Sequence, residues 1–436
     1  MSIKRRIIVG MTGPFGAGCS TLAKELENYH HFRKYSLSDA MRELAPRFIK
    51  DLDKQKLVSP KDREYQQWVG NEIRKQDFYA IPQKVFGKIR DDEKKDSALA
   101  SMDIVVDGIR NPGEMVFLRD KFPHFFVISV FASFSTRWKR SQKAYEGNEW
   151  SFRRDDERDS GESEPSHGQK VQLCVDRSDI SISNDIQFDQ PSIKEELQNR
   201  LGEYVHLMKE PAWRGSHPWE LNMAQAYDAS LASTCCKRKV GAVVVKEEAD
   251  VGDHRQRNYV IATGYNEVPL NIKSCADRGG RNNPEYCYKD EKIKEVIRRD
   301  YQKCPKCGTE IKFEENFTLP IICSNPECDA RIGKDFIPGR MLDICPAVHA
   351  EESAILQASK FGGTQIDGSV LYTTTFPCPL CAKMIVQAGI IKCYFVEPYP
   401  QDDAIKALDE GGITAQLFEG VKGRAYHRLF EHLPIK

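Results

Sequence analysis

The chain has 436 residues, enough for two or three domains that each bury a core of their own. Its 64 basic and 64 acidic residues balance, so it lacks the overall positive field with which proteins gather polyanions such as nucleic acids. No apolar run approaches the roughly 20 residues of a membrane span. The 14 cysteines fall mostly into close pairs, and without a secretory signal such pairs indicate metal sites in a reducing compartment. We therefore expect a cytoplasmic protein without membrane contact.

The first two hundred residues read as strands alternating with helices, which predicts a parallel sheet with crossover helices. The clearest strands are residues 6–11, 103–107 and 125–131. The first strand is followed by the run GPFGAGCS and then by a helix that begins near residue 21. Backbone N–H groups in such a loop can hold phosphate at the helix N-terminus, and the residues expected to bind a nucleotide are Gly13, Gly16, Gly18, Ser20 and Thr21.

This glycine-rich loop resembles a P-loop, with one departure. Cys19 stands where the G-x₄-G-K-[ST] pattern has lysine, so a positive charge on the β- and γ-phosphates is missing. We therefore expect nucleotide binding without efficient phosphoryl transfer. The alternative is that the glycines only permit a tight turn. With its arginine-rich loops, the segment from about residue 5 to 205 resembles a nucleoside or nucleotide kinase.

Two stretches interrupt the pattern before the second half of the chain. Residues 153–168 are so rich in charge that we expect a mobile loop or lid. The prolines and glycine of residues 209–218 mark a domain boundary, which gives a first domain over 1–208 and a second over 217–436. In the second, residues 219–232 are predicted to be helical, and residues 240–245 and 259–264 to be strands.

An insertion over residues 288–340 contains two cysteine knuckles, C-x₂-C and C-x₄-C, separated by 15 residues. Four thiolates close the coordination sphere of a zinc ion and leave no position for water, so the spacing predicts a structural zinc ribbon. Its ligands are Cys304, Cys307, Cys323 and Cys328. The alternatives are free cysteines in a loop, or a module that also contacts RNA or a protein partner.

The motif His349-Ala350-Glu351 precedes Pro377-Cys378-Pro379-Leu380-Cys381. One imidazole and two thiolates, from His349, Cys378 and Cys381, supply three zinc ligands and leave the fourth position open, as in a catalytic site. Glu351 lies beside the metal without binding it, where a carboxylate can carry protons. H-x-E with P-C-x-x-C is the signature of zinc deaminases. The alternative is a closed structural zinc site. Residues 350–360 are predicted to be helical, and residues 370–374 to be a strand.

From residue 219 to 436 the chain resembles the deoxycytidylate deaminase family. The resemblance rests on the runs STCCKRKVGAVVV and ATGYN and on the two zinc motifs. It implies an α/β/α sandwich of the cytidine deaminase type, and it places Asn266, Ala350 and Thr374 at the substrate. Glu267 stands where the family usually has glycine.

Together, the two halves resemble the two-domain dCTP/dCMP deaminases of bacterial anti-phage defence. That resemblance implies a homo-oligomer, with a hexamer as one form, and a regulatory nucleotide or RNA. The expected activity is zinc-dependent hydrolytic deamination of dCTP or dCMP, which would deplete the cytosine nucleotide pool. The alternatives are a deaminase of cytosine or adenine in polynucleotides, and a sensor without turnover. The sequence leaves open whether Cys235, Cys275, Cys287 and Cys345 bind a further zinc.

Overall fold

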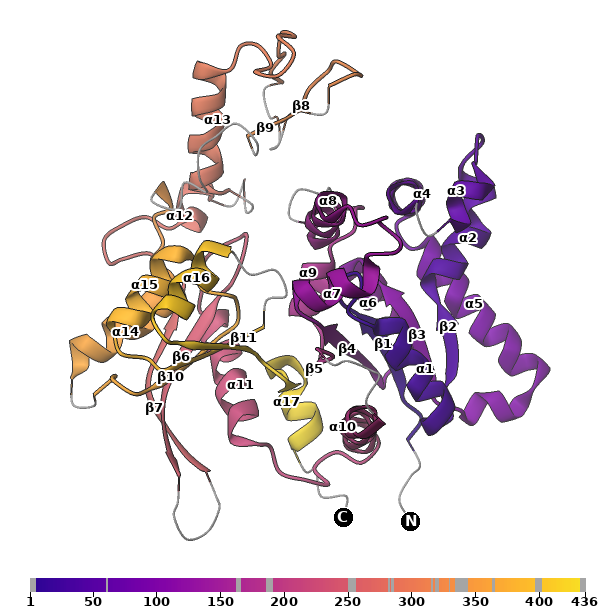
Figure 1. Cartoon of the computed structure of the whole chain (residues 1–436), viewed down its shortest axis with the longest axis horizontal. Coiled ribbons are helices and arrows are strands. Elements are labelled where there is room, and N and C mark those ends of the chain that lie inside the picture. The colour runs from indigo at the N-terminus through magenta and orange to yellow at the C-terminus, as the bar shows by residue number, and fades with distance from the viewer. Residues whose placement is uncertain are drawn as a thin grey trace.

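The structure is a computed structural model. It describes residues 5–59, 62–161, 166–185, 191–249, 256–280, 283, 286–314, 317, 321–328, 330–333, 344–362, 365–396 and 402–431. The fold has two α/β halves, each built on its own sheet, and an arm that projects from the second half (Figure 1). The expected α/β class is therefore confirmed.

The first sheet has six strands in the order β13-β5-β4-β1-β3-β2. The first five strands along the chain pair in parallel, and β1, β3 and β4 are apolar runs buried on both faces. The strands are β1 (Ile8–Thr12), β2 (Arg33–Ser36), β3 (Ile104–Ile109), β4 (Phe125–Phe131), β5 (Ile180–Ser183) and β13 (Gly420–Val421).

Helices cover both faces of this sheet. Leucines of α1, α10 and α17 belong to the apolar core on one face, and α2, α4, α5 and α6 contribute to the core on the other. The elements of the first half are α1 (Cys19–His30), α2 (Leu37–Phe48), α3 (Lys54–Val58), α4 (Arg63–Gln76), α5 (Ala80–Lys95), the 3₁₀ helix η1 (Ser97–Ser101), α6 (Pro112–Lys121), α7 (Phe134–Ser141), α8 (Glu149–Ser160), α9 (Val171–Asp176) and α10 (Pro191–Lys209).

The second sheet has five strands in the order β12-β11-β10-β6-β7. β6 and β7 form an antiparallel pair, β10 is antiparallel to β6, and β10, β11 and β12 are parallel. The strands are β6 (Gly241–Ala249), β7 (Gln256–Tyr265), β10 (Val370–Thr373), β11 (Lys392–Phe395) and β12 (Thr414–Leu417). One face carries α14 (Ala350–Phe361), α15 (Pro379–Gln387) and α16 (Asp402–Glu410), and the other carries α11 (Pro218–Leu231).

The two halves share structural elements. Strand β13 follows the second sheet along the chain but pairs with β5 of the first, and α17 (Gly423–Phe430) then packs into the core of the first half. In return, Val171 and Val175 of α9 pack with Val243 and Tyr372 of the second sheet. The predicted domains over 1–208 and 217–436 therefore contact one another through elements that cross between them.

The arm contains α12 (Cys275–Gly279), α13 (Tyr288–Asp300) and the short antiparallel pair β8 (Ile321–Ile322) and β9 (Arg331–Ile332). It extends away from both sheets, above α14 and α15 in the view of Figure 1. Ile297, Ile311 and Ile332 form a small core there together with three of the four knuckle cysteines. Residues 334–340 of the predicted insertion lie outside the described part of the chain.

One expectation about secondary structure is wrong. Residues 153–160, predicted as part of a mobile loop, continue helix α8, and residues 162–165 of the same stretch lie outside the described residues. The charges did not prevent burial, because acidic side chains of α8 pair with arginines elsewhere. Asp156 pairs with Arg137, and Asp159 pairs with Arg63 and Arg110.

Candidate active site and metal centres

The N-termini of two helices bring His349, Cys378 and Cys381 together. His349 is the residue that caps α14, and Cys378 caps α15, where its sulfur accepts the backbone N–H of Cys381. The Nδ1 atom of His349 lies 3.4 Å from each of the two sulfurs. All three donor atoms lie within 4.8 Å of one another. One nitrogen and two sulfurs at this spacing suit zinc with an open fourth position.

The pKa shifts in this group show that one of its two thiols is readily deprotonated, as metal binding requires. A hydrogen bond from Cys381 lowers the pKa of Cys378 to about 4, whereas the pKa of Cys381 is raised by the same contact and by burial. The pKa of His349 is raised chiefly by its hydrogen bond with Cys378. Cysteine binds metals as thiolate, so a group that already favours one thiolate suits a metal site.

Glu351 lies in the first turn of α14, two residues after the histidine. Its side chain is buried, with 2% exposure, and it accepts a hydrogen bond of 3.2 Å from the hydroxyl of Thr373. Burial raises the pKa of the Glu351 carboxyl. A carboxyl whose pKa lies closer to neutrality is better suited to take up and release protons during a reaction.

Thr373 was not among the predicted site residues, although its neighbour Thr374 was. Both lie at the end of β10, and alternate residues of a strand point to opposite faces. The odd-numbered Leu371 lies in the same apolar core as Ala350 and Ala354 of α14, so Thr373 shares the face that carries Glu351. Strand alternation could have identified it once the helix was known to cover that face.

The three residues predicted to contact substrate lie around the start of β6. The side-chain oxygen of Asn266 accepts the N–H of Val240 at 2.8 Å, and its amide nitrogen donates to the carbonyl of Arg238 at 2.9 Å. The hydroxyl of Thr374 accepts the N–H of Gly241 at 3.1 Å. Ala350 is fully buried. Asn266 and Thr374 therefore hold the backbone at this edge of the sheet, and their contacts to substrate stay a prediction.

Glu267, the residue that departs from the family's glycine, is hydrogen-bonded in the structure. Its carboxylate accepts the hydroxyl of Ser353 on α14 at 2.6 Å, and its backbone bridges to Val348 just before the metal-binding histidine. The side chain is therefore held against α14, and its effect is to tie the loop after β7 to the start of that helix.

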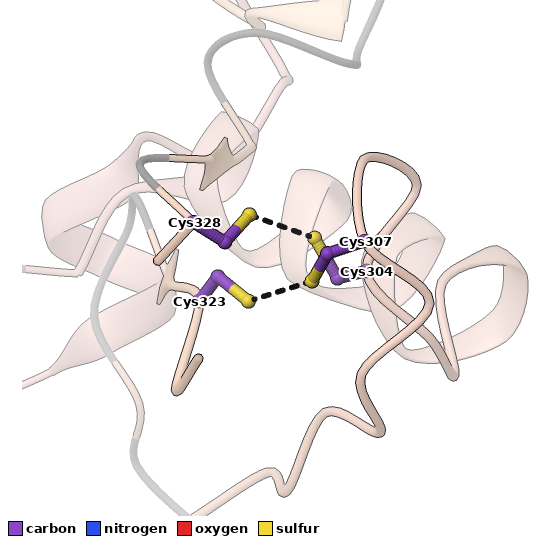
Figure 2. Close-up of side chains that lie close together, drawn as sticks. All are labelled: Cys304, Cys307, Cys323 and Cys328. Atoms are coloured by element: carbon purple, nitrogen blue, oxygen red, sulfur yellow. Dashed lines mark hydrogen bonds between the residues drawn. The ribbon is translucent and has the colours of Figure 1, made fainter. Parts of the chain in front are cut away.

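Four cysteines of the arm form a second cluster. The sulfurs of Cys304 and Cys328 lie 3.8 Å apart and those of Cys307 and Cys323 lie 3.4 Å apart (Figure 2). All four lie within 4.8 Å of one another. Four sulfurs complete a tetrahedral site, so this donor set suits a structural zinc. In contrast, Cys235, Cys275, Cys287 and Cys345 do not form a group within that distance in the described part of the chain, although the thiols of Cys235 and Cys275 add to the burial that raises the pKa of Cys345.

The glycine-rich loop joins β1 to α1, as predicted from the sequence. Gly16 and Gly18 have φ angles of 79° and 100°, in the left-handed region that glycine adopts without strain. Ser20 and Thr21 are exposed in the first turn of α1. Burial raises the pKa of the Cys19 thiol to about 12, so this side chain offers no charge where a P-loop has lysine. The N–H of Phe15 donates to the carboxylate of Asp159 at 3.1 Å.

Residues 218–397 match the family described as the cytidine and deoxycytidylate deaminase zinc-binding region. Over 185 residues the chain is 29% identical to the deoxycytidylate deaminase of Enterobacteria phage T4, and the match covers 41% of this chain and 76% of that enzyme. It is 28% identical over 191 residues to the deoxycytidylate deaminase of Saccharomyces cerevisiae, covering 44% of this chain and 41% of the yeast protein.

The crystal structure of the dCMP deaminase from the cyanophage S-TIM5 in apo form aligns with 47% of this chain and all of its own, at 24% identity and a TM-score of 0.26. Among the helices in the described part of the chain, none is both long and apolar enough to cross a membrane.

Proposed function

We propose that the chain deaminates deoxycytidine nucleotides, dCMP or dCTP, by hydrolysis, because residues 218–397 match the cytidine and deoxycytidylate deaminase zinc-binding region and the donor atoms of His349, Cys378 and Cys381 lie close enough to hold one metal ion. The observation that carries the proposal is the placement of buried Glu351 beside the His349, Cys378 and Cys381 group. Three protein donors with an adjacent proton carrier are what the displacement of an amino group by water requires.

Zinc held by His349, Cys378 and Cys381 would lower the pKa of the water that adds to C4 of the base. Glu351 moves the protons. It accepts one proton from the incoming water and delivers it to N3 of the base, and then it accepts the proton of the new C4 hydroxyl and delivers that one to the departing amino group. The C4–N bond breaks, a C4–O bond forms, and ammonia and a deoxyuridine nucleotide leave. The hydroxyl of Thr373 fixes the direction of the Glu351 carboxylate during these transfers.

The substrate is proposed to contact the edge of the sheet where β6 begins. Asn266 retains one hydrogen and one lone pair beyond its bonds to the backbone, so it can still hydrogen-bond sugar or base. Thr374 and Ala350 form the adjacent wall. A mononucleotide suits a chain without net charge better than a polynucleotide does, because polynucleotide binding draws most of its affinity from cationic side chains.

The N-terminal half is proposed to bind a nucleotide at Gly13, Gly16, Gly18, Ser20 and Thr21 and to regulate the deaminase. Transfer of phosphate is expected to be poor because Cys19 is uncharged. The order of the parallel strands supports this proposal, since β1 lies between β3 and β4, and ligands of such sheets bind where neighbouring strands leave in opposite directions.

A structural zinc at Cys304, Cys307, Cys323 and Cys328 belongs to the same proposal. Assembly as a homo-oligomer, cytoplasmic location, and depletion of cytosine nucleotides in anti-phage defence rest on the resemblance to the two-domain deaminases. A second regulatory ligand, such as RNA, rests on the same resemblance.

The deciding experiment is incubation of the purified protein with dCMP, dCTP, CTP and single-stranded DNA, followed by chromatography of the products. Conversion of dCMP or dCTP to the deoxyuridine nucleotide, with ammonia released in equal amount, is the expected result. Conversion of cytosine or adenine only within single-stranded DNA would favour the polynucleotide deaminase. No conversion of any substrate by zinc-loaded protein would favour a sensor without turnover.

A further inference from the structure

Helix α4 in the N-terminal half carries a buried glutamine that the fold does not use. Gln67 is 2% exposed, and neither its amide nitrogen nor its amide oxygen has a hydrogen-bond partner among the described residues. Leaving a buried polar group unpaired destabilises the folded protein. An amide that stays unpaired in the protein at that cost is a candidate for pairing with a ligand.

The neighbours of Gln67 place it at the ligand-binding edge of the sheet. Arg63 and Arg74 lie one turn before it and two turns after it on the same face of α4. Arg63 pairs with Asp159 at 3.0 Å, and Arg74 pairs with Glu114 at 2.7 Å. Arg110, the residue that follows β3, bonds to both of these acids. The stretch of α4 that contains Gln67 is therefore tied at one end to Asp159, beside the glycine-rich loop, and at the other to Glu114, beside the carboxyl end of β3.

Asp159 occupies an anion position beside that loop. Its side chain is fully buried and faces three donors: the backbone N–H of Phe15 at 3.1 Å, the guanidinium of Arg63 at 3.0 Å and that of Arg110 at 3.0 Å. Two guanidinium groups and a glycine-loop amide are the donors that bind phosphate. The carboxylate of Asp159 thus makes the contacts that a phosphate oxygen would make.

Helix α8, which carries Asp159, borders an open cleft. A cleft of about 800 Å³ lies between α4 and α8, lined in part by Trp68, Tyr145 and Arg154. The ion pairs from Arg154 and Arg158 to Glu64 that span this cleft are partly exposed, and such pairs contribute little to stability.

We propose that the N-terminal half binds a nucleoside 5′-phosphate in which the base pairs with the amide of Gln67 and the phosphate replaces the carboxylate of Asp159. This inference rests on the nucleotide-binding role proposed above for the glycine-rich loop. It adds Gln67 as the residue that recognises the base and Asp159 as the carboxylate that competes with the phosphate. A glutamine amide presents a donor and an acceptor side by side, as the edges of nucleobases do. Gln67 and Arg63 are separated by one helical turn, about 6 Å, which a nucleoside can bridge between its base and its phosphate.

The test is calorimetric titration of the full-length, zinc-loaded protein with nucleotides that lack cytosine: dAMP, dATP, dGMP, dGTP, dTMP and dTTP. Inorganic tripolyphosphate serves as a probe without a base. The variant Gln67→Met keeps the size of the side chain and removes both hydrogen-bonding groups. We expect it to bind the preferred nucleotide about tenfold more weakly or worse, with unchanged affinity for tripolyphosphate. The exposed Gln83 on α5 provides the control Gln83→Met, which should bind both ligands as the parent does.

A second variant, Asp159→Asn, tests whether the Asp159 carboxylate competes with phosphate. The expected result is a gain in ligand affinity, which a folding defect would not produce. Removing the internal anion should raise the affinity for both nucleotide and tripolyphosphate, and the thermal midpoint of each variant is measured alongside. Equal nucleotide affinity in Gln67→Met and the parent would overturn the base-reading role. No gain in Asp159→Asn would overturn the competition. No binding of the whole panel by either the parent or Asp159→Asn would overturn the site, and deamination of dCMP or dCTP in the same preparations separates that failure from failure of the deaminase.

Discussion

Glu351 combines three properties that are seldom found together at one position: it is buried, it is acidic, and it lies at the N-terminus of a helix beside three metal-binding side chains. The helix terminus favours a negative charge there, while burial raises the pKa of the carboxyl. A group whose two protonation states are so balanced can serve as a proton carrier rather than only as a fixed charge.

We predict that Glu351→Gln retains zinc and loses turnover by roughly 10²–10⁴-fold, because the amide keeps the shape and cannot exchange protons. Metal analysis and the rate of dCMP or dCTP deamination are measured on the same sample. Glu352→Gln, one residue later on the same helix, is the matched control and should stay close to the parent rate. Activity of Glu351→Gln within tenfold of the parent would remove Glu351 from the proposed reaction.

Lys422 is a second buried charge, and it lies where the two halves meet. Its side chain is fully buried, and its ammonium donates to the carbonyl of Val175 on α9. Burial lowers the pKa of Lys422 to about 7, well below its ordinary value. Below pH 7 the folded protein carries the full cost of a buried charge. Between pH 7 and about 10 the unfolded chain binds more protons than the folded one, so this residue makes the free energy of unfolding rise with pH.

The variant Lys422→Met should therefore be more stable than the parent at pH 6.5, by an amount that shrinks as the pH approaches 9.5. Ser178 still donates to the carbonyl of Val175, so the substitution leaves that carbonyl paired. Urea unfolding of both proteins across this pH range gives the difference directly. Lys406→Met, at an exposed position of α16, should show a difference that does not change with pH. If the difference in free energy of unfolding between Lys422→Met and the parent did not change with pH, burial of the Lys422 ammonium would not destabilise the folded protein.

The sequence identified His349, Cys378, Cys381 and Glu351 because their chemistry depends on spacings of two and three residues within one motif. The structure brings the donor atoms of His349, Cys378 and Cys381 within 4.8 Å of one another, and the roles of the four residues stay a prediction. Thr373, Gln67 and Lys422 were not identified, because what distinguishes each is a neighbour or a burial supplied by a distant part of the chain. Short sequence patterns do not predict contacts between distant parts of the chain.

At the scale of elements, strongly apolar segments were predicted well. The strand predicted at residues 125–131 is β4, and the helix predicted at 350–360 is α14 with one further residue. Helix α8 was missed for a physical reason. Asp155, Asp156 and Asp159 are all buried, and hydrogen bonds and ion pairs with residues elsewhere in the chain offset the desolvation of their carboxylates. Charge content alone therefore overstates exposure when arginines lie close in space.

The arm offers a prediction about metal content. With one zinc at the His349 group and one in the arm, the parent should contain about two per chain. The double substitution Cys304→Ser and Cys307→Ser should lower this to about one. It should also speed hydrogen exchange in α13, because the small core of the arm includes Cys304 itself. Deamination should persist, since the arm and the His349 group are separate clusters.

The variant Cys19→Ser, which removes a thiol outside both clusters, is the control for zinc content. A parent protein with one zinc per chain would contradict the assignment of the arm. Loss of both metals in the double variant would show instead that the arm supports the fold around His349.

At the scale of the whole molecule, the two halves are joined by exchange of elements as well as by the connecting chain. The N–H of Ser183 on β5 donates to Glu419, 236 residues later. Val421, Ala425 and Leu429 then lie fully buried in the core of the first half. The boundary predicted at residues 209–218 describes the order of the chain, while residues 420–430 pack on α11 of the second half and also supply a strand and apolar side chains to the first half.

We predict that Leu429→Ala lowers the free energy of unfolding by about 2–5 kcal/mol and acts on the first half. Hydrogen exchange should quicken in β5, α1 and α10 and change little in β10 and β11. Leu356→Ala, at a residue that is 51% exposed on α14, should cost far less. If instead the second sheet loosened and the first did not, residues 423–430 would have to be assigned to the second half. For the same reason, a fragment of residues 217–436 is expected to expose the apolar side of α17.

Strand β13 also sets an order for folding during synthesis. The first sheet can assemble β1 to β5 as soon as they leave the ribosome, but its edge at β5 stays unpaired until the entire second sheet has been made. An open strand edge is a template for pairing with other chains, so the nascent first half passes through a stage in which it is prone to aggregate. Folding of the first half is therefore expected to finish only after the second sheet has been synthesised, and synthesis rate, temperature and chaperone supply should affect the yield of the first half more than that of the second.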